Sequence, residues 1–255
     1  MVGLVATSRP PGPFGGEHST AASLAGRIGR VLNVLRDGQE LEGKSLAAMG
    51  DVVSQEFLVA ELDVRYPGDH IRSEEGPSSP GGSRLWVVDP LDGSREYGEG
   101  RDDWAVHVAL VVDGAPVVGA VALPALDLVL STLDPPTLKD EAATPPRIVV
   151  SRSRPPALAT ELAARLGATT IPMGSAGAKI AAVIRGEADI YVHAGGQYEW
   201  DSAAPVAVAL VAGCNATRID GSPLRYGRPD PWLPDLLVCH PSLAERALEA
   251  LADLA

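Results

Sequence analysis

The sequence predicts a layered α/β fold in two lobes, on three observations. Apolar residues recur at helical spacing before residue 66, alternate with a period of two between residues 85 and 132, and fall into alternating strand-like and helix-like segments after residue 146. The chain has 255 residues, of which 45% are hydrophobic and 21% are charged, enough to bury a large core. This composition excludes fibrous, collagenous and wholly disordered proteins.

The N-terminal part of the sequence predicts two helices ahead of any strand. We expect a Pro- and Gly-rich lead-in over residues 1–17 and an N-terminal α+β lobe over residues 18–134. The first helix is expected from Thr20, and the second from Asp51 to the residue before Tyr66-Pro67-Gly68. Their expected apolar faces are Leu24, Ile28, Val31 and Leu35 in the first helix, and Val53, Phe57, Ala60 and Val64 in the second.

The apolar period then shifts to two, which predicts strands. Residues 85–88 are a short apolar run typical of a buried strand, and residues 127–132 are expected to form another. Between them, residues 105–112 and 117–123 flank Asp113-Gly114, a dipeptide typical of tight turns, and therefore predict a hairpin.

A proline-dense linker over residues 134–146 precedes an expected C-terminal α/β lobe over residues 147–255. The alternation of segments in this lobe is typical of α/β layering. Strands are expected at residues 148–150, 190–192 and 236–239, and helices at residues 157–166, 178–185, 203–212 and 242–254.

The charge balance is acidic, with 21 Lys and Arg against 33 Asp and Glu and a formal net charge of −12. Polymeric nucleic acid and anionic membranes would repel such a chain, so neither is an expected partner. We expect a cytoplasmic protein, because no secretory leader pattern and no long apolar run is present. Cys214 and Cys239 match no metal-binding spacing and are expected to be reduced core residues, although a disulfide between them stays open.

The clearest chemical pattern is Trp86-Val87-Val88-Asp89-Pro90-Leu91-Asp92-Gly93-Ser94. An apolar strand delivers two carboxylates three positions apart, and Gly93 permits a sharp turn towards the Ser94 hydroxyl. Carboxylates this close repel each other unless a cation lies between them, and Mg²⁺ prefers oxygen ligands. The backbone N–H groups of the turn suit a phosphate oxygen. A lone pattern of this kind also occurs in ordinary turns, so both interpretations stay open here.

Two further acidic segments are candidates for the same site. Ser73-Glu74-Glu75 lies in a loop after the second helix, and Trp200-Asp201 precedes an apolar helix. Taken alone, the glutamates are typical of solvated loop charges, and the aspartate is typical of a helix cap.

In combination, these motifs resemble the signature of the inositol monophosphatase superfamily, the Mg-dependent, Li-sensitive phosphatases that include fructose-1,6-bisphosphatases. The matching segments are Glu74-Glu75, Asp89-Pro90-Leu91-Asp92-Gly93-Ser94 and Trp200-Asp201-Ser202-Ala203-Ala204. The resemblance runs from about Thr20 to the C-terminus. It implies an αβαβα sandwich, a phosphoric monoester hydrolase and two or three Mg²⁺ ions per site. Such ions neutralise the phosphate dianion, acidify the attacking water and stabilise the leaving alkoxide.

The resemblance also implies a role for each motif residue. Asp51 matches the aspartate that pairs with the motif hydroxyl, here Ser94, to orient the attacking water, and Glu75 is similar to the acid that lies behind the metal ligands. Gly93 and Ser94 would contact the phosphate. The implied metal ligands are Glu74, Asp89, Asp92, Asp201 and the backbone carbonyl of Leu91.

Two segments, Gly100 to His107 and Gly196 to Asp201, look most like the actinobacterial CysQ-type branch of this family. Those enzymes hydrolyse the 3'-phosphate of 3'-phosphoadenosine 5'-phosphate (PAP) in sulfur metabolism. The resemblance implies that Lys179 and Ser175 hold a second phosphate. The Gln197 amide and the Tyr198 ring would then contact the base or the ribose. The expected substrate-binding residues are Gly93, Ser94, Gly174, Ser175, Lys179, Gln197 and Tyr198.

Two departures and three alternatives accompany this interpretation. Gly50 precedes Asp51 where many relatives have threonine, and the loop from Gly76 to Arg84 is short. The same chemistry on inositol monophosphate, fructose 1,6-bisphosphate or a nucleoside monophosphate of a specialised biosynthetic pathway is the first alternative. A non-catalytic metal- or phosphate-sensing module is the second, although it would not need both Asp51 and Ser94. A purely structural role is the third, and it would require the acidic residues to lie apart in space. Relatives often form homodimers, which leaves a second copy of the chain as a candidate partner.

Overall fold

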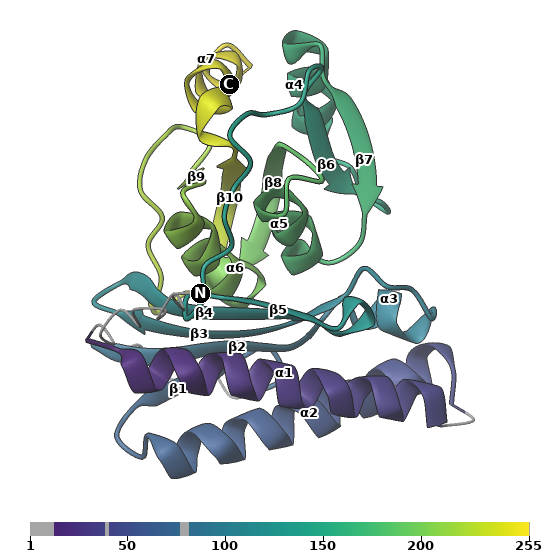
Figure 1. Ribbon diagram of the computed structural model, residues 1–255, viewed down its shortest axis with the longest axis vertical. Coiled ribbons are helices and arrows are strands. Elements are labelled where there is room, and N and C mark those ends of the chain that lie inside the picture. The colour runs from purple at the N-terminus through teal and green to yellow at the C-terminus, as the bar shows by residue number, and fades with distance from the viewer. Residues whose placement is uncertain (1–12, 39–40, 77–81, 255) are drawn as a thin grey trace, which may run out of the picture.

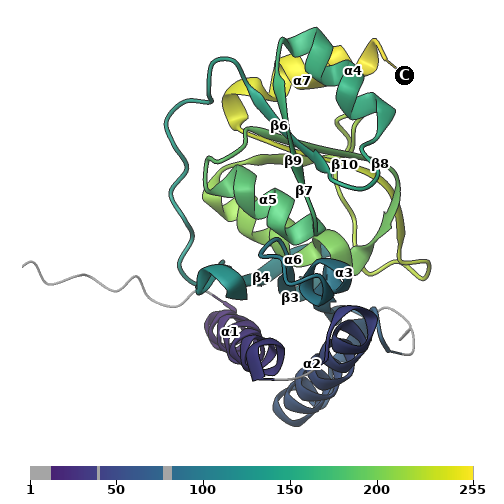
Figure 2. The ribbon, with the colours of Figure 1, turned by 90° about the vertical axis from the view of Figure 1, so that its right-hand side faces the viewer.

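The chain folds into layers in the order helices, sheet, helices, sheet, helices (Figures 1 and 2). The computed structural model describes residues 13–38, 41–76 and 82–254. The predicted αβαβα sandwich is confirmed. The outer helices on one side are α1 (Gly15–Gly38) and α2 (Gly43–Arg65), the middle helices are α5 (Ala176–Ile184) and α6 (Glu199–Ala212), and those on the far side are α4 (Ala157–Leu166) and α7 (Ala244–Ala252).

Helices α1 and α2 cover one face of the first sheet through leucine-rich stripes. The buried stripes include Leu24, Ile28 and Leu32 in α1 and Leu46, Leu58 and Leu62 in α2. Val31 and Val64, which the sequence places on the apolar faces, are instead 43% and 82% exposed. In each helix a nearby leucine takes the inward position, so the predicted faces are partly wrong.

Both helices begin earlier than the sequence predicts. Helix α1 starts at Gly15 rather than Thr20, so the end of the predicted lead-in is helical, while residues 1–12 lie outside the described residues. Helix α2 starts at Gly43, well before Asp51, and no side chain caps its first turn. Because start signals come mainly from capping side chains, an uncapped helix is hard to place from sequence.

The first sheet contains the strands and the hairpin that the sequence predicts. Its order is β1 (His70–Ser73), β2 (Arg84–Asp92), β3 (Ala105–Val112), β4 (Ala115–Leu123) and β5 (Leu128–Ser131). The β3–β4 hairpin turns at Asp113 and Gly114, whose φ angles are 49° and 81°, as in turns with two left-handed residues. The sequence does not predict β1, a short strand whose only large apolar residue is Ile71.

The second sheet lies between the middle helices and the far helices (Figure 2). Its order is β7 (Thr169–Met173), β6 (Arg147–Ser151), β8 (Ile190–Tyr198), β10 (Trp232–Cys239) and β9 (Asn215–Thr217). The predicted strands lie inside β6, β8 and β10, and the predicted helices agree with α4 to α7 within a few residues. The edge strands β7 and β9 are not predicted. Short helical turns complete the chain at α3 (Ser94–Gly98), Pro124–Leu126 and Pro241–Leu243.

Helix α6 packs closely against the first sheet. A Cβ atom on Gly119 of β4 would collide with the backbone of Ala204 in α6, so glycine permits this approach. Val87 of β2 belongs to the core on the α6 side, and its neighbour Val88 belongs to the core under α1 and α2. The first sheet is therefore buried on both faces. Polar groups on its α6-facing side lie between the sheet and the middle helices.

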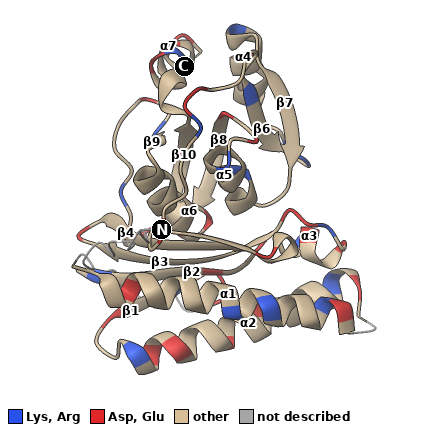
Figure 3. Cartoon of the chain, viewed as in Figure 1, with Lys and Arg blue, Asp and Glu red and all other residues tan. Residues whose placement is uncertain are grey.

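Residues 134–146 connect the two sheets without a helix or strand, as the linker prediction expects. The first sheet lies within the predicted N-terminal lobe, residues 18–134, and the second sheet within the predicted C-terminal lobe, residues 147–255. Figure 3 shows acidic and basic residues interspersed along the ribbons of α1 and α2. Cys214 and Cys239 are buried free thiols. Among the described residues, no helix is both long and apolar enough to span a lipid bilayer.

Candidate active site

A β-bulge brings Asp89 and Asp92 to the same face of the first sheet. Residues three apart in a regular strand face opposite sides. Asp89 lies opposite His107 of β3, but Asp92 lies opposite Ala105, so the register shifts by one residue between the two aspartates. Pro90 lies within this irregularity, where a strand tolerates a residue without an N–H group. Both carboxylates therefore face the middle helices.

The Asp92 carboxylate is bound by the first turn of α5. Its Oδ2 atom accepts hydrogen bonds from the Ser175 hydroxyl and the Gly177 N–H, both at 2.6 Å, and its Oδ1 atom accepts one from the Ala176 N–H at 3.2 Å. Gly177 is required here, since a Cβ atom would collide with the His107 ring. A helix N-terminus favours a negative charge, so α5 holds this carboxylate in place.

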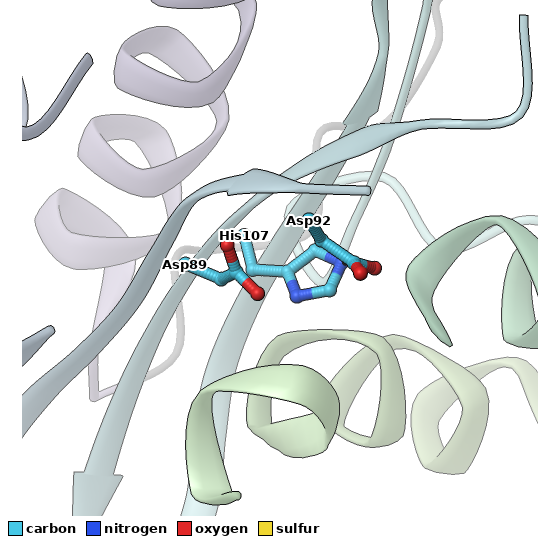
Figure 4. A group of neighbouring side chains, drawn as sticks. All are labelled: Asp89, Asp92 and His107. Carbon is cyan, nitrogen blue, oxygen red and sulfur yellow. The ribbon is translucent and has the colours of Figure 1, made fainter. Parts of the chain in front are cut away.

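His107 lies between the two aspartates (Figure 4). Its Nδ1 atom is 2.9 Å from the Trp200 carbonyl oxygen, an acceptor, and therefore carries the proton. Its buried Nε2 atom has no hydrogen-bond partner among the described residues and lies 3.3 Å from Asp92 Oδ2. Burial lowers the pKa of His107, so the ring is neutral and its lone pair faces a carboxylate. One ligand atom from each of Asp89, Asp92 and His107 lies within 4.8 Å of the others.

Glu74 and Asp201 extend this acidic cluster. Partial desolvation, followed by the charges of Asp201 and Asp92, raises the pKa of Glu74 to about 7. Burial and then Asp92 raise the pKa of Asp201 to about 7. Burial raises the pKa of Asp89 well above its ordinary value, with further contributions from Asp92, Glu74 and Asp201. The structure thus brings four of the predicted metal ligands together, and burial and mutual repulsion raise the pKa values of three of them, Glu74, Asp89 and Asp201.

The donor chemistry of the cluster fits a hard divalent cation. Carboxylate oxygens are the ligands that Mg²⁺ prefers, and the mutual repulsion of clustered carboxylates is relieved when a cation binds. The unpartnered lone pair of His107 Nε2 is consistent with a site built to receive positive charge. The ordinary interpretation of Asp201 also holds, because its Oδ2 atom accepts a hydrogen bond from the Tyr198 N–H at 2.6 Å and so caps α6.

Asp51 lies in α2, and Ser94 is the first residue of α3, two positions after Asp92. Burial and then the charge of Glu75 raise the pKa of Asp51 to about 6, so these two acids are neighbours. Ser94 begins α3 directly after Gly93, whose φ of 87° requires glycine at this turn. Among the described residues no hydrogen bond joins the Asp51 carboxylate to the Ser94 hydroxyl, and their pairing stays a prediction.

The side chains around Gly50 explain why this chain departs from the family pattern at that position. A Cβ atom at this position would come within 2.9 Å of the side chains of Leu91 and Tyr97. The threonine found in many relatives would therefore not fit beside these neighbours without a shift.

The segment before α5 uses its polar groups internally. The Lys179 ammonium donates hydrogen bonds to the carbonyls of Gly174 and Ser175, at 2.5 and 2.7 Å, and lies 5.4 Å from the Tyr191 ring centroid. Asp103 accepts a hydrogen bond from the Gly174 N–H and is also bound by Arg101. A phosphate-binding role for Lys179 and Ser175 therefore stays a prediction.

Among the described residues, the segment before α6 contains an amide without a hydrogen-bond partner and an exposed aromatic ring. The Gln197 side chain is 7% exposed, and neither its amide oxygen nor its amide nitrogen has a partner among the described residues. Tyr198 is 46% exposed and stacks on Trp200, with ring centroids 4.7 Å apart and an angle of 11° between planes. These features suit contact with a flat polar ring such as a nucleobase.

Residues to which the sequence assigns no role in the site also shape it: His107 is expected from the sequence to be a structural histidine, and Arg72 and Glu199 carry no expectation. Arg72 and Glu199 form a fully buried ion pair with an N–O distance of 2.6 Å. His107 interrupts an apolar strand pattern, and Arg72 and Glu199 each stand two positions before a predicted metal ligand. For Arg72 and Glu199, this short separation in sequence from the motifs is the only local feature that points to the site. A cavity of about 410 Å³ beside Arg101 and Met173 contains none of the predicted metal ligands.

Known proteins resemble this chain in sequence and in fold. The sequence model described as the inositol monophosphatase family matches residues 19–254. A 3'-phosphoadenosine 5'-phosphate phosphatase of Mycobacterium tuberculosis is 46% identical over 221 residues, which cover 82% of this chain and 83% of that protein. Its counterpart in Mycobacterium leprae is 39% identical over 255 residues, covering 93% and 94%. The solved structure of CysQ from Bacteroides thetaiotaomicron has a TM-score of 0.77 at 25% identity, covering 89% of this chain and 98% of that one.

Proposed function

This chain belongs to the inositol monophosphatase family, and from that membership we propose that it is a Mg²⁺-dependent phosphatase that removes the 3'-phosphate of PAP. It would thus act as a 3'(2'),5'-bisphosphate nucleotidase. One structural observation carries the proposal: carboxylates from three separate segments converge beside the Gly93-Ser94 turn. The relatives with 46% and 39% identity, both PAP phosphatases by name, support this substrate.

The cation is proposed to bind where the acidic side chains meet. Mg²⁺ there would neutralise charge on the phosphate and lower the pKa of a water molecule. The residues proposed to hold it are Glu74, Asp89, Asp92, Asp201 and the carbonyl of Leu91.

Asp51 and Ser94 are proposed to prepare the attacking water. With a pKa of about 6, the Asp51 carboxylate is mostly ionised at pH 7 and can accept a proton. Its neighbour Glu75 contributes to that raised pKa, which brings it closer to the working pH. The Ser94 hydroxyl, at the start of α3, would orient the water, and the N–H groups of Gly93 and Ser94 would bind a phosphate oxygen.

The nucleoside is proposed to lie against the start of α6. The exposed ring of Tyr198 offers a stacking surface, and the unpartnered amide of Gln197 offers both a donor and an acceptor. Lys179 donates to two carbonyls, which leaves one ammonium hydrogen for the second phosphate beside Ser175 and Gly174.

Three further properties complete the proposal. Li⁺ would inhibit the enzyme, the setting would be the cytoplasm, and a homodimer is the proposed assembly if the chain self-associates. None of these is needed for the chemistry derived from the side chains above.

The substrate is tested by phosphate release in Mg²⁺, with and without Li⁺, from PAP, AMP, inositol 1-phosphate and fructose 1,6-bisphosphate. We expect PAP to lead by at least about tenfold in kcat/KM, which corresponds to about 1.4 kcal/mol. If AMP or a sugar phosphate leads, the metal site stands and the nucleoside pocket is wrong. If no compound releases phosphate, the result favours the alternative of a non-catalytic metal- or phosphate-sensing module.

A further inference from the structure

A buried ion pair joins the two lobes through residues that lie close in sequence to two of the proposed metal ligands. The Arg72 guanidinium lies 2.6 Å from the Glu199 carboxylate, and both side chains are fully buried. Arg72 belongs to β1 of the first sheet, and Glu199 is the first residue of α6. The pair therefore connects segments that lie 127 residues apart in the sequence.

Each partner stands two residues before a proposed metal ligand. Arg72 is followed by Ser73, the last residue of β1, and by Glu74 in the turn after it. Glu199 is followed by Trp200 and Asp201 in the first turn of α6. Two residues span about 7 Å of extended strand and about 3 Å of helix, so a shift of either partner is passed to its ligand with little slack.

The Glu199 carboxylate has a fixed orientation. Its Oε2 atom binds Arg72, and its Oε1 atom accepts a hydrogen bond from the Arg228 N–H at 3.0 Å. The Glu199 N–H donates to the Pro231 carbonyl at 2.9 Å. The start of α6 is thus anchored to the 228–231 segment of its own lobe, and Arg72 extends that anchor to the other lobe.

The end of β1 needs such an anchor. β1 is a four-residue edge strand, and its backbone pairs only with β2. Pairing with β2 fixes the position of Glu74 relative to Asp89. It does not fix the position of Glu74 relative to Asp201 on α6. The Ser73 hydroxyl donates to Gln55 of α2, which is also in the first lobe. Arg72 thus supplies a direct tie from β1 to α6.

A buried ion pair is a weak source of stability, because two charges lose their hydration, and apolar residues of similar volume often serve as well. An ion pair instead fixes the distance and the orientation of its two partners. We propose that Arg72 and Glu199 are positioning residues that hold Glu74 and Asp201 at the spacing required for cation binding. This inference rests on the proposed function, since it assumes that the acidic cluster binds Mg²⁺.

The chain offers a matched control pair. Arg147 and Asp189 form a charge-assisted pair at 2.9 Å within the C-terminal lobe, where Asp189 also accepts hydrogen bonds from the backbone of Ala143 and Arg147. None of the proposed metal ligands contacts this pair. Loss of Asp189 should reduce stability without moving the acidic cluster.

The test measures Mg²⁺ binding to the full chain without substrate, by isothermal titration calorimetry, together with thermal unfolding in EDTA. We expect Glu199→Gln to weaken Mg²⁺ binding at least tenfold and Arg72→Lys to weaken it at least threefold, because lysine is shorter and lacks the planar fork. Asp189→Asn should bind Mg²⁺ within twofold of the unmodified protein while unfolding at a lower temperature. If Glu199→Gln does not fold, Arg72→Lys decides the question.

Asp89→Asn separates this inference from the proposed function. If Asp89→Asn loses Mg²⁺ binding but Glu199→Gln and Arg72→Lys bind within twofold of the unmodified protein, the metal site stands and the positioning role is wrong. If Asp89→Asn binds Mg²⁺ normally, the proposed metal site is wrong and the positioning role falls with it.

Discussion

The Nε2 atom of His107 lies 3.3 Å from the Oδ2 atom of Asp92, on the α6-facing side of the first sheet. The opposite ring nitrogen donates to the Trp200 carbonyl, which fixes the tautomer and joins β3 to the first turn of α6. Because burial lowers the pKa of His107, the imidazole brings no positive charge to the aspartates. This histidine therefore does not compensate the negative charge of the acidic cluster.

His107→Ala should destabilise the metal-free protein by about 2–4 kcal/mol, because it leaves a cavity and removes the donor to the Trp200 carbonyl. Urea unfolding in EDTA measures this loss. His107→Asn keeps an N–H donor in a smaller side chain and should lose less. A metal-free His107→Ala protein as stable as the unmodified one would show that this contact is not part of the core.

Asp89→Asn should weaken Mg²⁺ binding at least about 100-fold, or about 2.7 kcal/mol, because a buried charged ligand becomes a neutral amide. The same change should raise the unfolding temperature in EDTA, since one of several mutually repelling carboxylates is removed. Calorimetry and thermal unfolding measure the two effects. Asp189→Asn, which breaks an ion pair, should lower the unfolding temperature, and equal behaviour of the two variants would contradict the assignment.

Asp201→Asn should become increasingly more stable than the unmodified protein as the pH rises from 5 to 8 in EDTA. The pKa of Asp201 is raised to about 7 in the folded state, so the folded protein binds an extra proton between about pH 4 and pH 7 and loses that stability as the pH rises through 7. The expected change in relative stability is on the order of 2 kcal/mol.

Comparison with the unmodified protein cancels the opposite pH dependence of buried histidines such as His107 and His193, whose lowered pKa values occur in both proteins. Denaturant unfolding at each pH measures the difference. A difference that does not depend on pH would mean that Asp201 is ionised without cost.

Tyr198→Ala should raise the KM for PAP by about tenfold while leaving kcat within about threefold, because stacking of a base on an aromatic ring contributes about 1–3 kcal/mol. Tyr198→Phe keeps the ring and should behave like the unmodified protein. Activity on p-nitrophenyl phosphate, which carries no nucleoside, should be the same for all three proteins. Equal losses on both substrates would place Tyr198 in the metal site instead.

The sequence predicts the parts of the fold that local patterns encode. The Asp113-Gly114 turn and the apolar alternation around it predict the β3–β4 hairpin with nearly correct ends. Strand β1 and the start of α2 are missed, because a four-residue strand and an uncapped helix start carry little local signal.

The acidic motifs around Asp89 and Asp201 name carboxylates that the structure brings together, but they do not predict how these side chains meet. The bulge between Asp89 and Asp92 follows from pairing with β3, and the Arg72–Glu199 pair follows from the packing of α6 against the first sheet. Both depend on contacts between distant segments, which no local spacing encodes. The same holds for the binding of Asp92 by the first turn of α5.

The most direct test of the proposed activity is to identify which phosphate leaves PAP. The purified chain is incubated with PAP in Mg²⁺ or in EDTA, and the products are followed by phosphorus NMR and chromatography. We predict inorganic phosphate and 5'-AMP in Mg²⁺ and no reaction in EDTA. Release of the 5'-phosphate to give 3'-AMP, or the absence of reaction in Mg²⁺, would contradict the account.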